Sequence, residues 1–484
     1  MTARSDLPAD FVWGTATAAY QVEGAAALDG RGPSIWDTFA RRPGAVVGGD
    51  TGDVAVDHYH RFGEDVDLMR ELGTNAYRFS LSWSRLLPEG TGTVNRAGVD
   101  FYRRLAERLL ERGVAPWATL YHWDLPQALQ DRGGWLERDT AERFADFAAT
   151  AHDALGDLVT SWITLNEPWC AAFLGHGSGV HAPGLQVGAR ASHAAHHLLL
   201  GHGLAVDAVR AGRSGASVGV TLNLYSVRPA SDGAADRDAA RRVDGLQNRF
   251  FLEPVLAGRY PEDVVRDLGE QEWFAANAAD LARIQRPIDF LGVNYYSRHT
   301  VAAPDAAPLA APDAAPDAAP DAAPGAVRSP AAGESTFGPA FPGSEDVRSV
   351  DTGAPRTHMG WPVVPEGLVD VLEQAHALAP ALPLHVTENG SAYPDTVGGD
   401  GLVHDAERLR YLQQHVDACA AARERGIPLQ GYFVWSLMDN FEWAWGFSRR
   451  FGLVHVDYAT QQRTVKDSGR WLRAFLREGA TTAD

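Results

Sequence analysis

The feature that most constrains the fold is an alternation of strand-like and helix-like runs along the whole chain. Short runs rich in β-branched and aromatic residues are typical of buried strands, and longer runs with helical spacing follow them. The expected strands are residues 11–18, 74–83, 115–123, 161–167, 217–224, 288–296, 382–390 and 428–437. The expected helices are residues 60–73, 99–113, 138–155, 190–211, 236–257, 366–379, 405–425 and 467–477.

Eight strands, each with a helix after it, predict an α/β fold, and within that class a closed (β/α)8 TIM barrel. We expect residues 1–484 to form a single catalytic domain with long βα loops. Alternation by itself also allows an open doubly wound sheet. The count of eight favours the barrel, and so does the lack of a glycine-rich phosphate turn after the first strand.

One segment departs from this alternation. Residues 302–324 read AAPDAAPLAAPDAAPDAAPDAAP, with proline at every fourth position. Ala/Pro/Asp repeats lack the side chains that bury a core. We interpret the segment as a low-complexity loop insertion within the domain, between the sixth strand and the sixth helix; a functional lid is the less favoured alternative.

Charge and cysteine content exclude several classes of partner. The formal net charge is −19 at pH 7, and phosphate backbones and anionic lipids are bound by Lys and Arg. We therefore expect no nucleic-acid and no membrane partner. Cys170 and Cys419 fit neither a disulfide framework nor a zinc site. The sequence predicts a cytoplasmic protein and leaves a homo-oligomer open.

Polar and aromatic side chains gather where the expected strands end. In a barrel these ends meet on one face, which is where barrel enzymes place their sites. A single such residue is usually a cap or a loop residue, but seven of the eight strand ends carry one. The residues are Gln21, Arg78, His122, Trp123, Asn166, Glu167, Asn294, Tyr296, Glu388, Asn389, Trp435, Glu442 and Trp443.

Two of these residues, Glu167 and Glu388, are carboxylic acids at the ends of apolar strands. Glycoside hydrolysis needs such a pair: one carboxyl protonates the leaving oxygen, and the other attacks the anomeric carbon or activates water. The alternative is a buried structural ion pair, in which Arg78 would be the partner of Glu388. The choice between retention and inversion depends on a distance that the sequence does not contain.

Eight short sequence motifs, taken together and in their order along the chain, are informative about the family. They are FVWGTATAAYQVEG (11–24), YRFSLSWSR (77–85), YHWDLPQAL (121–129), TLNEP (164–168), NYYSR (294–298), MGWPVVPEGL (359–368), VTENG (386–390) and WSLMDNFEWAWGFSRRFGLVHVD (435–457). Together they resemble glycoside hydrolase family 1, the retaining β-glucosidase-type enzymes. The likeness covers about residues 8–477, and only the Ala/Pro/Asp repeat departs from it.

The resemblance implies a retaining enzyme that releases terminal β-D-glucose through a covalent glycosyl-enzyme, with no cofactor and no metal. The implied substrates are small β-glucosides and oligosaccharides such as cellobiose, and also β-galactosides and β-fucosides. Glu167 would be the general acid/base and Glu388 the nucleophile. The implied substrate-binding residues are Gln21, His122, Asn166, Asn294, Tyr296, Trp435, Glu442 and Trp443, with Arg78 in support. Cys170, Leu174, His181 and Trp361 would line the outer, aglycone side, and Phe451 is a weaker member of the pocket.

The chemistry of these residues fits the implied roles. Arg78 and the Tyr296 hydroxyl can keep Glu388 ionised. Glu167 has no cation beside it in sequence, so burial should raise its pKa and leave it protonated.

There are two alternatives to the predicted β-glucosidase function, a phospho-β-glycosidase and a non-catalytic sugar-binding protein, and one candidate metal site. Phospho-β-glycosidases of the same family carry a Ser and a Lys in the loop after strand eight, whereas this chain has DNFEWAWGFSRR (439–450), where Glu442 would repel a 6-phosphate. A non-catalytic sugar-binding relative would lack one of the two glutamates, and both are present. His193 and His197 have a metal-like i, i+4 spacing, but no carboxylate pattern accompanies them, so we expect no metal.

Overall fold

Eight parallel strands close into a barrel in the computed structural model, which describes residues 2–212, 215–304 and 335–478. The order around the barrel is β1-β12-β11-β7-β5-β4-β3-β2. Each expected strand range contains one barrel strand, so the predicted (β/α)8 barrel is confirmed. The strands are β1 (Val12–Ala16), β2 (Ala76–Ser80), β3 (Ala115–Tyr121), β4 (Ser161–Asn166), β5 (Ser217–Asn223), β7 (Phe290–Asn294), β11 (Leu384–Asn389) and β12 (Leu429–Trp435).

The barrel strands are buried on both faces, because side chains fill the interior and helices cover the outside. Every residue of β2, β7 and β11 is buried. These strands nevertheless carry Arg78, Asn294 and Glu388, whose polar groups need partners at that depth. The barrel itself therefore brings these three side chains together.

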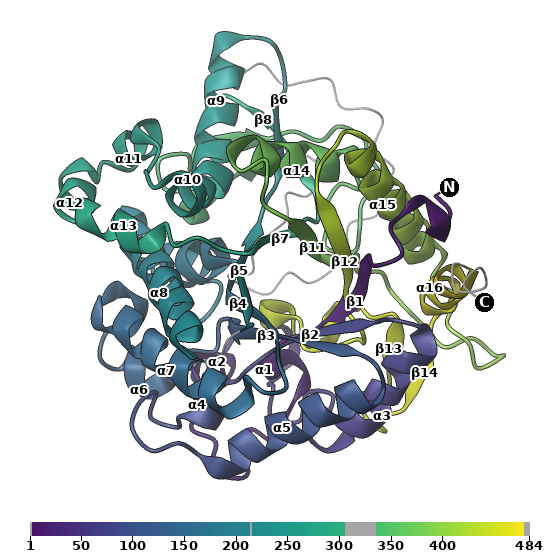
Figure 1. Cartoon of the computed structure of the whole chain (residues 1–484). Helices are drawn as coiled ribbons and strands as arrows, with labels where there is room; N and C mark the ends of the chain where they lie inside the picture. The colour runs from purple at the N-terminus through teal and green to yellow at the C-terminus, as the bar shows by residue number, and fades with distance from the viewer. Residues whose placement is uncertain (1, 213–214, 305–334, 479–484) are drawn as a thin grey trace.

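Helices form an outer layer around the barrel strands (Figure 1). Their burial follows the apolar stripe of each sequence: in α5, Phe101, Leu105 and Leu109 are buried at a spacing of one turn. The principal helices are α3 (His58–Leu72), α5 (Arg96–Glu111), α7 (Asp139–Leu155), α8 (Ala191–Ala211), α14 (Glu366–Leu378), α15 (Ala406–Glu424) and α16 (Asp467–Glu478).

The expected helix over residues 236–257 is three helical segments. These are α9 (Ala234–Asp244), a π-helical turn η6 (Gly245–Arg249) and α10 (Phe250–Ala257). Within the π turn, Gln247 donates to the Asn223 carbonyl oxygen at 3.2 Å, and Asn248 donates to the Tyr225 carbonyl oxygen at 2.8 Å. These polar side chains attach the turn to the end of β5 and to the residues after it. Hydrophobic periodicity in the sequence does not reveal such a turn.

A second sheet, which the sequence did not predict, lies beside the carboxyl ends of β5 and β7. Its strands are β6 (Ser226–Pro229), β8 (Arg298–Ala302), β10 (Arg348–Ser349) and β9 (Ser335–Thr336). In Figure 1, β6 and β8 extend beside α9 at the upper edge of the barrel. The predicted insertion at 302–324 begins at the end of β8, and its residues 305–324 lie outside the described residues.

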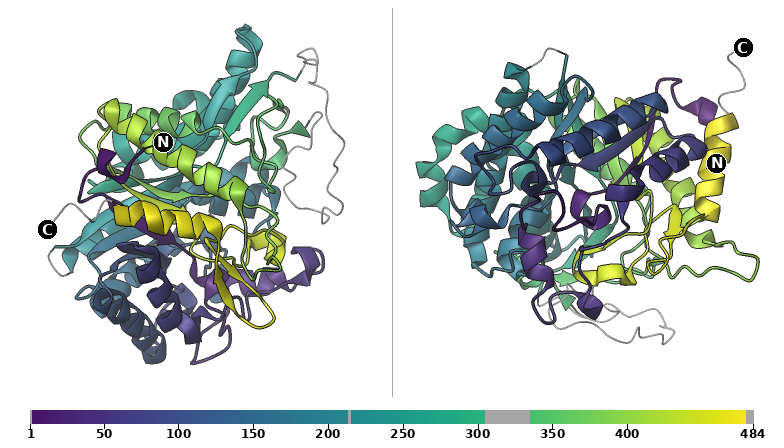
Figure 2. Two further views of the ribbon diagram at one scale, coloured as in Figure 1. Left: turned by 90° about the vertical axis from the view of Figure 1, so that its right-hand side faces the viewer. Right: turned by 90° about the horizontal axis from the view of Figure 1, so that it is seen from below.

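The two ends of the described chain lie on the same side of the barrel (Figure 2). The first turn, η1 (Arg4–Asp6), contacts α16. Among the helices of the described ranges, none is both long and apolar enough to cross a membrane.

Candidate active site

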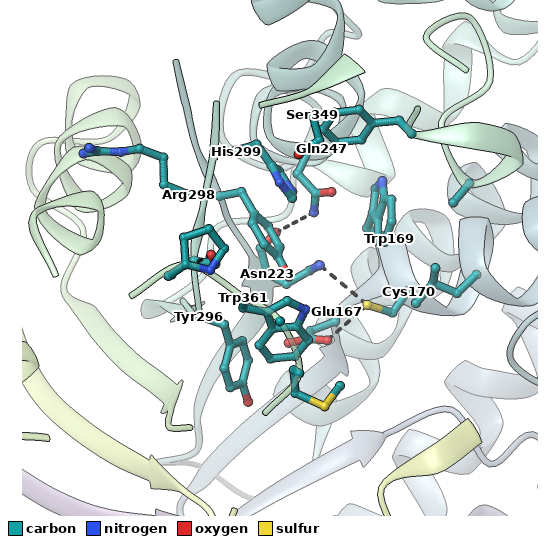
Figure 3. A pocket seen from close by; sticks show the side chains of 18 of the residues that line it. Glu167, Trp169, Cys170, Asn223, Gln247, Tyr296, Arg298, His299, Ser349 and Trp361 are labelled. Atoms are coloured by element: carbon teal, nitrogen blue, oxygen red, sulfur yellow. Dashed lines mark hydrogen bonds between the residues drawn. The ribbon is translucent and has the colours of Figure 1, made fainter. Parts of the chain in front are cut away.

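A cavity of about 380 Å³ lies at the carboxyl ends of the barrel strands. Figure 3 shows Glu167, Tyr296 and Trp361 among its walls. The predicted site residues that line it are His122, Glu167, Tyr296, Glu388, Trp435, Glu442 and Trp443. The predicted outer residues Cys170, Leu174, His181 and Trp361 line it too, and so does Phe451, predicted as a weaker member of the pocket. Gln21, Arg78, Asn166 and Asn294 do not line the cavity; they are buried behind it.

Glu388, near the end of β11, has a charged partner and a neutral one. Arg78 forms an ion pair with Glu388 Oε1, and the Tyr296 hydroxyl donates to Oε2 at 2.7 Å. Burial raises the pKa of Glu388, while Arg78 and Tyr296 oppose the rise by stabilising the carboxylate. Arg78 and Tyr296 thus contact the carboxyl of Glu388. That they keep it ionised stays a prediction.

Glu167, which follows β4, is held by neutral donors. The Asn294 amide donates to its Oε1 at 2.7 Å, and the Cys170 thiol donates to its Oε2 at 3.2 Å. Burial, with the nearby charge of Glu388, raises the pKa of Glu167 to about 8. Among the described residues a cation contacts Glu388 but not Glu167, which favours the proton on Glu167 when the two carboxyls share one.

A buried network fixes the amides between the two carboxyls. The Oδ1 atom of Asn166 accepts from Arg78 Nη2 at 2.6 Å and from Asn294 Nδ2 at 3.0 Å. The Thr387 hydroxyl donates to Asn294 Oδ1 at 2.7 Å, which leaves the Asn294 amino group to face Glu167. The Asn166 amino group must then face the other way, toward His122.

This orientation also fixes the tautomer of His122. Asn166 Nδ2 lies 2.9 Å from His122 Nε2, and an amide nitrogen only donates, so Nε2 accepts and the ring proton is on Nδ1. Burial and Arg78 hold the pKa of His122 well below its usual value, so the ring is neutral. Its Nδ1–H has no partner among the described residues and is available to a ligand hydroxyl.

Two further polar atoms at the site lack partners in the described part of the chain. Gln21 Nε2 donates to the Phe441 carbonyl at 2.7 Å, which leaves its Oε1 free, and Glu442 Oε2 is also unpaired. Burial and the two other glutamates raise the pKa of Glu442 to about 8. Buried polar atoms normally have partners. The free Nδ1–H of His122 and the free Oε2 of Glu442, both at the cavity, suit a ligand with several hydroxyls.

The backbone is irregular where it carries the carboxyls. The register of β11 shifts between Val386 and Glu388, and that of β4 shifts between Ile163 and Asn166. Glu167 itself has a φ of 47°, in the left-handed region. Such a conformation costs roughly 1–3 kcal/mol in a non-glycine residue and is found where a side chain must be aimed.

Tryptophans form much of the wall around these polar groups. Trp435 is stacked beside the His122 ring with centroids 5.8 Å apart, and Trp443 lies 4.6 Å from the Trp123 ring. Flat apolar rings of this kind can pack against the apolar face of a sugar. The site thus combines stacking surfaces with unpaired hydrogen-bonding groups.

Several residues that line the cavity were not predicted from the sequence. Asn223 ends β5, the one expected strand to which no site residue was assigned, because the predicted strand ran on to Leu224. Asn223 is a polar residue at the end of a barrel strand, so the pattern that identified the other site residues also applies to it. Other missed residues come from loops, from the π turn and from the second sheet, and they include Tyr225, Gln247, Arg298, His299, Phe337, Phe341 and Arg356.

The histidine pair on α8 has other partners. His193 lies 2.9 Å from Glu270 Oε2 and stacks on Trp273 with ring centroids 3.9 Å apart. His197 Nδ1 lies 2.9 Å from the Trp135 carbonyl oxygen. The described ranges contain no group of three or more His, Cys, Asp or Glu side chains that could hold a metal.

Two carboxyls with different partners, one a cation and the other neutral donors, at the mouth of a TIM barrel and among unpaired polar atoms, are typical of a glycoside hydrolase. The chain belongs to glycosyl hydrolase family 1, whose model matches residues 3–480. It is therefore a retaining O-glycosyl hydrolase.

Known relatives are similar over nearly the whole chain. A bifunctional β-D-glucosidase/β-D-fucosidase of Bifidobacterium breve is 48% identical, with 97% of this chain and 98% of the relative covered. β-Glucosidase A of Thermotoga maritima is 44% identical, covering 96% of each chain. The crystal structure of a psychrophilic β-glucosidase of Micrococcus antarcticus is 47% identical, with a TM-score of 0.89 and 99% of each chain covered.

Replacing Tyr296 by phenylalanine tests the contact with Glu388. The variant loses a hydrogen bond to the carboxylate, so the pKa of Glu388 rises and the acidic limb of the kcat/KM profile moves up by about one pH unit. The matched control is Tyr295→Phe, because the Tyr295 hydroxyl donates to the Val364 carbonyl instead. An unmoved limb in Tyr296→Phe, or equal shifts in both variants, would contradict the assignment.

Proposed function

We propose that the protein is a β-glucosidase in which Glu388 is the nucleophile and Glu167 the general acid/base. The observation that carries this assignment is the asymmetry between the two carboxyls. Glu388 pairs with the Arg78 guanidinium, whereas Glu167 receives hydrogen bonds from neutral groups only and has its pKa raised to about 8. An ionised carboxylate and a protonated one are what the first half of a double displacement requires.

In the first half-reaction, Glu388 Oε2 or Oε1 attacks the anomeric carbon while Glu167 gives its proton to the departing glycosidic oxygen. The carboxylate of Glu388 becomes a neutral ester in this step. The negative charge that raised the pKa of Glu167 is then gone, so Glu167 ionises more readily.

In the second half-reaction, Glu167 acts as the base. It removes a proton from water, the water oxygen bonds to the anomeric carbon, and the ester bond to Glu388 breaks. Glu388 leaves as a carboxylate beside Arg78, and Glu167 is again protonated. Two displacements at one carbon retain its configuration.

The glycone is held by groups at the cavity that lack partners among the described residues. His122 Nδ1–H donates to a sugar hydroxyl, Glu442 Oε2 hydrogen-bonds to another, and Trp435 packs against the ring. Gln21, whose Oε1 is also unpaired, does not line the cavity, so its contact with the sugar stays a prediction. The names of the relatives, β-glucosidases and a β-glucosidase/β-fucosidase, support glucose as the glycone with fucosides as further substrates. We expect β-galactosides to be hydrolysed as well.

The cavity lining extends beyond Glu167 to Asn223 and Gln247, which supports a second sugar ring on that side. A β-linked glucose disaccharide such as cellobiose is thus the substrate we propose, with no cofactor. Both cysteines are free and buried, which supports a cytoplasmic location.

A sugar 6-phosphate is the disfavoured alternative. Phosphate recognition needs a cation in the pocket. Lys466 is the only lysine of the chain, and its Nζ is buried between Asp395 at 2.5 Å and Asp439 at 2.6 Å. Two arginines, Arg298 and Arg356, line the cavity, but each already pairs with a carboxylate, Asp370 and Asp351. Glu442, the carboxyl at the pocket, repels a phosphate once it is ionised above its pKa of about 8.

The acid role is tested with Glu167→Ala and a series of leaving groups. Alkyl β-glucosides need protonation of the leaving oxygen, so kcat/KM for them falls by about 10²–10⁴-fold. For 2,4-dinitrophenyl β-glucoside, whose leaving group needs no proton, kcat/KM changes little. Azide restores turnover of the trapped glycosyl-enzyme and yields the β-glycosyl azide. Equal losses for all leaving groups would show that Glu167 is not the acid.

The prediction that the sugar is unphosphorylated is tested by comparing hydrolysis of 4-nitrophenyl β-glucoside with that of its 6-phosphate. We expect kcat/KM to be about 100-fold or more in favour of the unphosphorylated sugar, because a like charge in a buried pocket costs several kcal/mol. Both ratios are measured above pH 8, where Glu442 is ionised, and there the Glu442→Gln variant should narrow the ratio of the two kcat/KM values by removing the repulsion. A preference for the phosphate in the wild-type enzyme would refute the glucosidase assignment.

A further inference from the structure

The thiol of Cys170 lies directly against the carboxyl of Glu167. Cys170 Sγ is 3.2 Å from Glu167 Oε2, and Cys170 is only 7% exposed. The backbone holds the pair in place, because the Cys170 amide donates to the Glu167 carbonyl oxygen at 3.0 Å at the start of η4 (Cys170–Ser178). Figure 3 shows the thiol between Asn223 and Glu167.

The neighbours of the sulfur determine the direction of this contact. Asn223 Nδ2 donates to Cys170 Sγ at 3.5 Å, so the sulfur is an acceptor on that side and its S–H is left to donate to Glu167. Burial and the charge of Glu167 raise the pKa of Cys170 well above its usual value. The thiol therefore stays protonated and remains a donor over the working pH range.

The neighbours of Glu167 determine which of its oxygens carries the acid proton. Asn294 Nδ2 donates to Oε1, and this amide cannot turn over because its Oδ1 accepts from Thr387. Oε1 is thus an acceptor whether or not Glu167 is protonated. The proton resides on Oε2, the oxygen that faces Cys170.

The thiol contact consequently differs between the two forms of Glu167. In the acid form, Oε2 carries the proton that goes to the glycosidic oxygen, and its lone pairs accept weakly. In the carboxylate form, Oε2 bears negative charge and accepts the S–H strongly. The hydrogen bond therefore favours the carboxylate.

We propose that Cys170 is a positioning residue for the second half-reaction, in which its S–H holds Oε2 of the Glu167 carboxylate toward the attacking water. The proposal rests on the acid/base role proposed for Glu167. During this step the water proton passes to Oε2, the water oxygen bonds to the anomeric carbon, and the ester to Glu388 breaks. Cys170 keeps its proton throughout.

Other ionisable groups also act on Glu167, and they are unchanged when Cys170 is replaced. They come from the barrel strands and the loops that follow them: Arg78, Tyr225, Tyr296, Glu388 and Glu442. A shift on replacing Cys170 alone therefore reports the thiol contact.

The test compares Cys170→Ala, which removes the donor, with Cys170→Ser, which supplies a stronger one. The basic limb of kcat/KM for an alkyl β-glucoside reports loss of the Glu167 proton. It should move up by about half a pH unit in Cys170→Ala and down in Cys170→Ser. The acidic limb, which reports Glu388, should stay in place in both variants.

A second readout isolates the second half-reaction. With 2,4-dinitrophenyl β-glucoside, hydrolysis of the glycosyl-enzyme limits kcat, and the acidic limb of kcat reports ionisation of Glu167 in the intermediate. This limb should also move to higher pH in Cys170→Ala and to lower pH in Cys170→Ser. The control is Cys419→Ala, because Cys419 is equally buried but lies on α15 and outside the cavity, and it should move neither limb.

The outcomes separate this proposal from the role on which it depends. If neither limb moves, or if the Ala and Ser variants move them in the same direction, Cys170 only fills space. If the wild-type enzyme has no basic limb that depends on the leaving group, the acid/base role of Glu167 fails instead. Should Cys170→Ala not fold, the downward shift in the near-isosteric Cys170→Ser decides alone.

Discussion

The buried guanidinium of Arg78 is the group on which the rest of the site depends. It is fully buried on β2 and contacts Glu388 on β11, Asn166 on β4, the Thr387 carbonyl oxygen and the Thr119 hydroxyl. A buried cation without its anion costs about 3–5 kcal/mol, so Arg78 and an ionised Glu388 require each other. The ion pair joins opposite parts of the barrel and sets the charge of the cavity.

The different roles of the two carboxyls follow from this ion pair. Glu388 is stabilised as an anion by a cation, and its charge in turn helps to raise the pKa of Glu167. The same charge disappears when the glycosyl-enzyme forms. The neutral donors around Glu167 then allow one side chain to serve as acid first and as base afterwards, because no fixed cation commits it to either form.

The sequence predicted the barrel and the residues at the strand ends because both follow from local patterns. Apolar runs locate Glu167 and Glu388, and closure of eight strands brings them to one face. The missed residues depend on longer-range packing. Gln247 reaches the site from a π turn, and His299 belongs to a second sheet of very short strands. Cys170 was predicted to line the cavity and does, but only the fold of η4 reveals that its thiol contacts the acid.

The central claim, that Glu388 is the nucleophile, is tested most directly by trapping the glycosyl-enzyme. A 2-deoxy-2-fluoro-β-glucoside with a dinitrophenolate leaving group forms the intermediate and slows its hydrolysis, so a peptide digest followed by mass spectrometry locates the sugar. The account predicts one fluoroglucosyl unit on the peptide that contains Glu388, and none on the peptide that contains Glu167. A label on Glu167, or on any other residue, would contradict it.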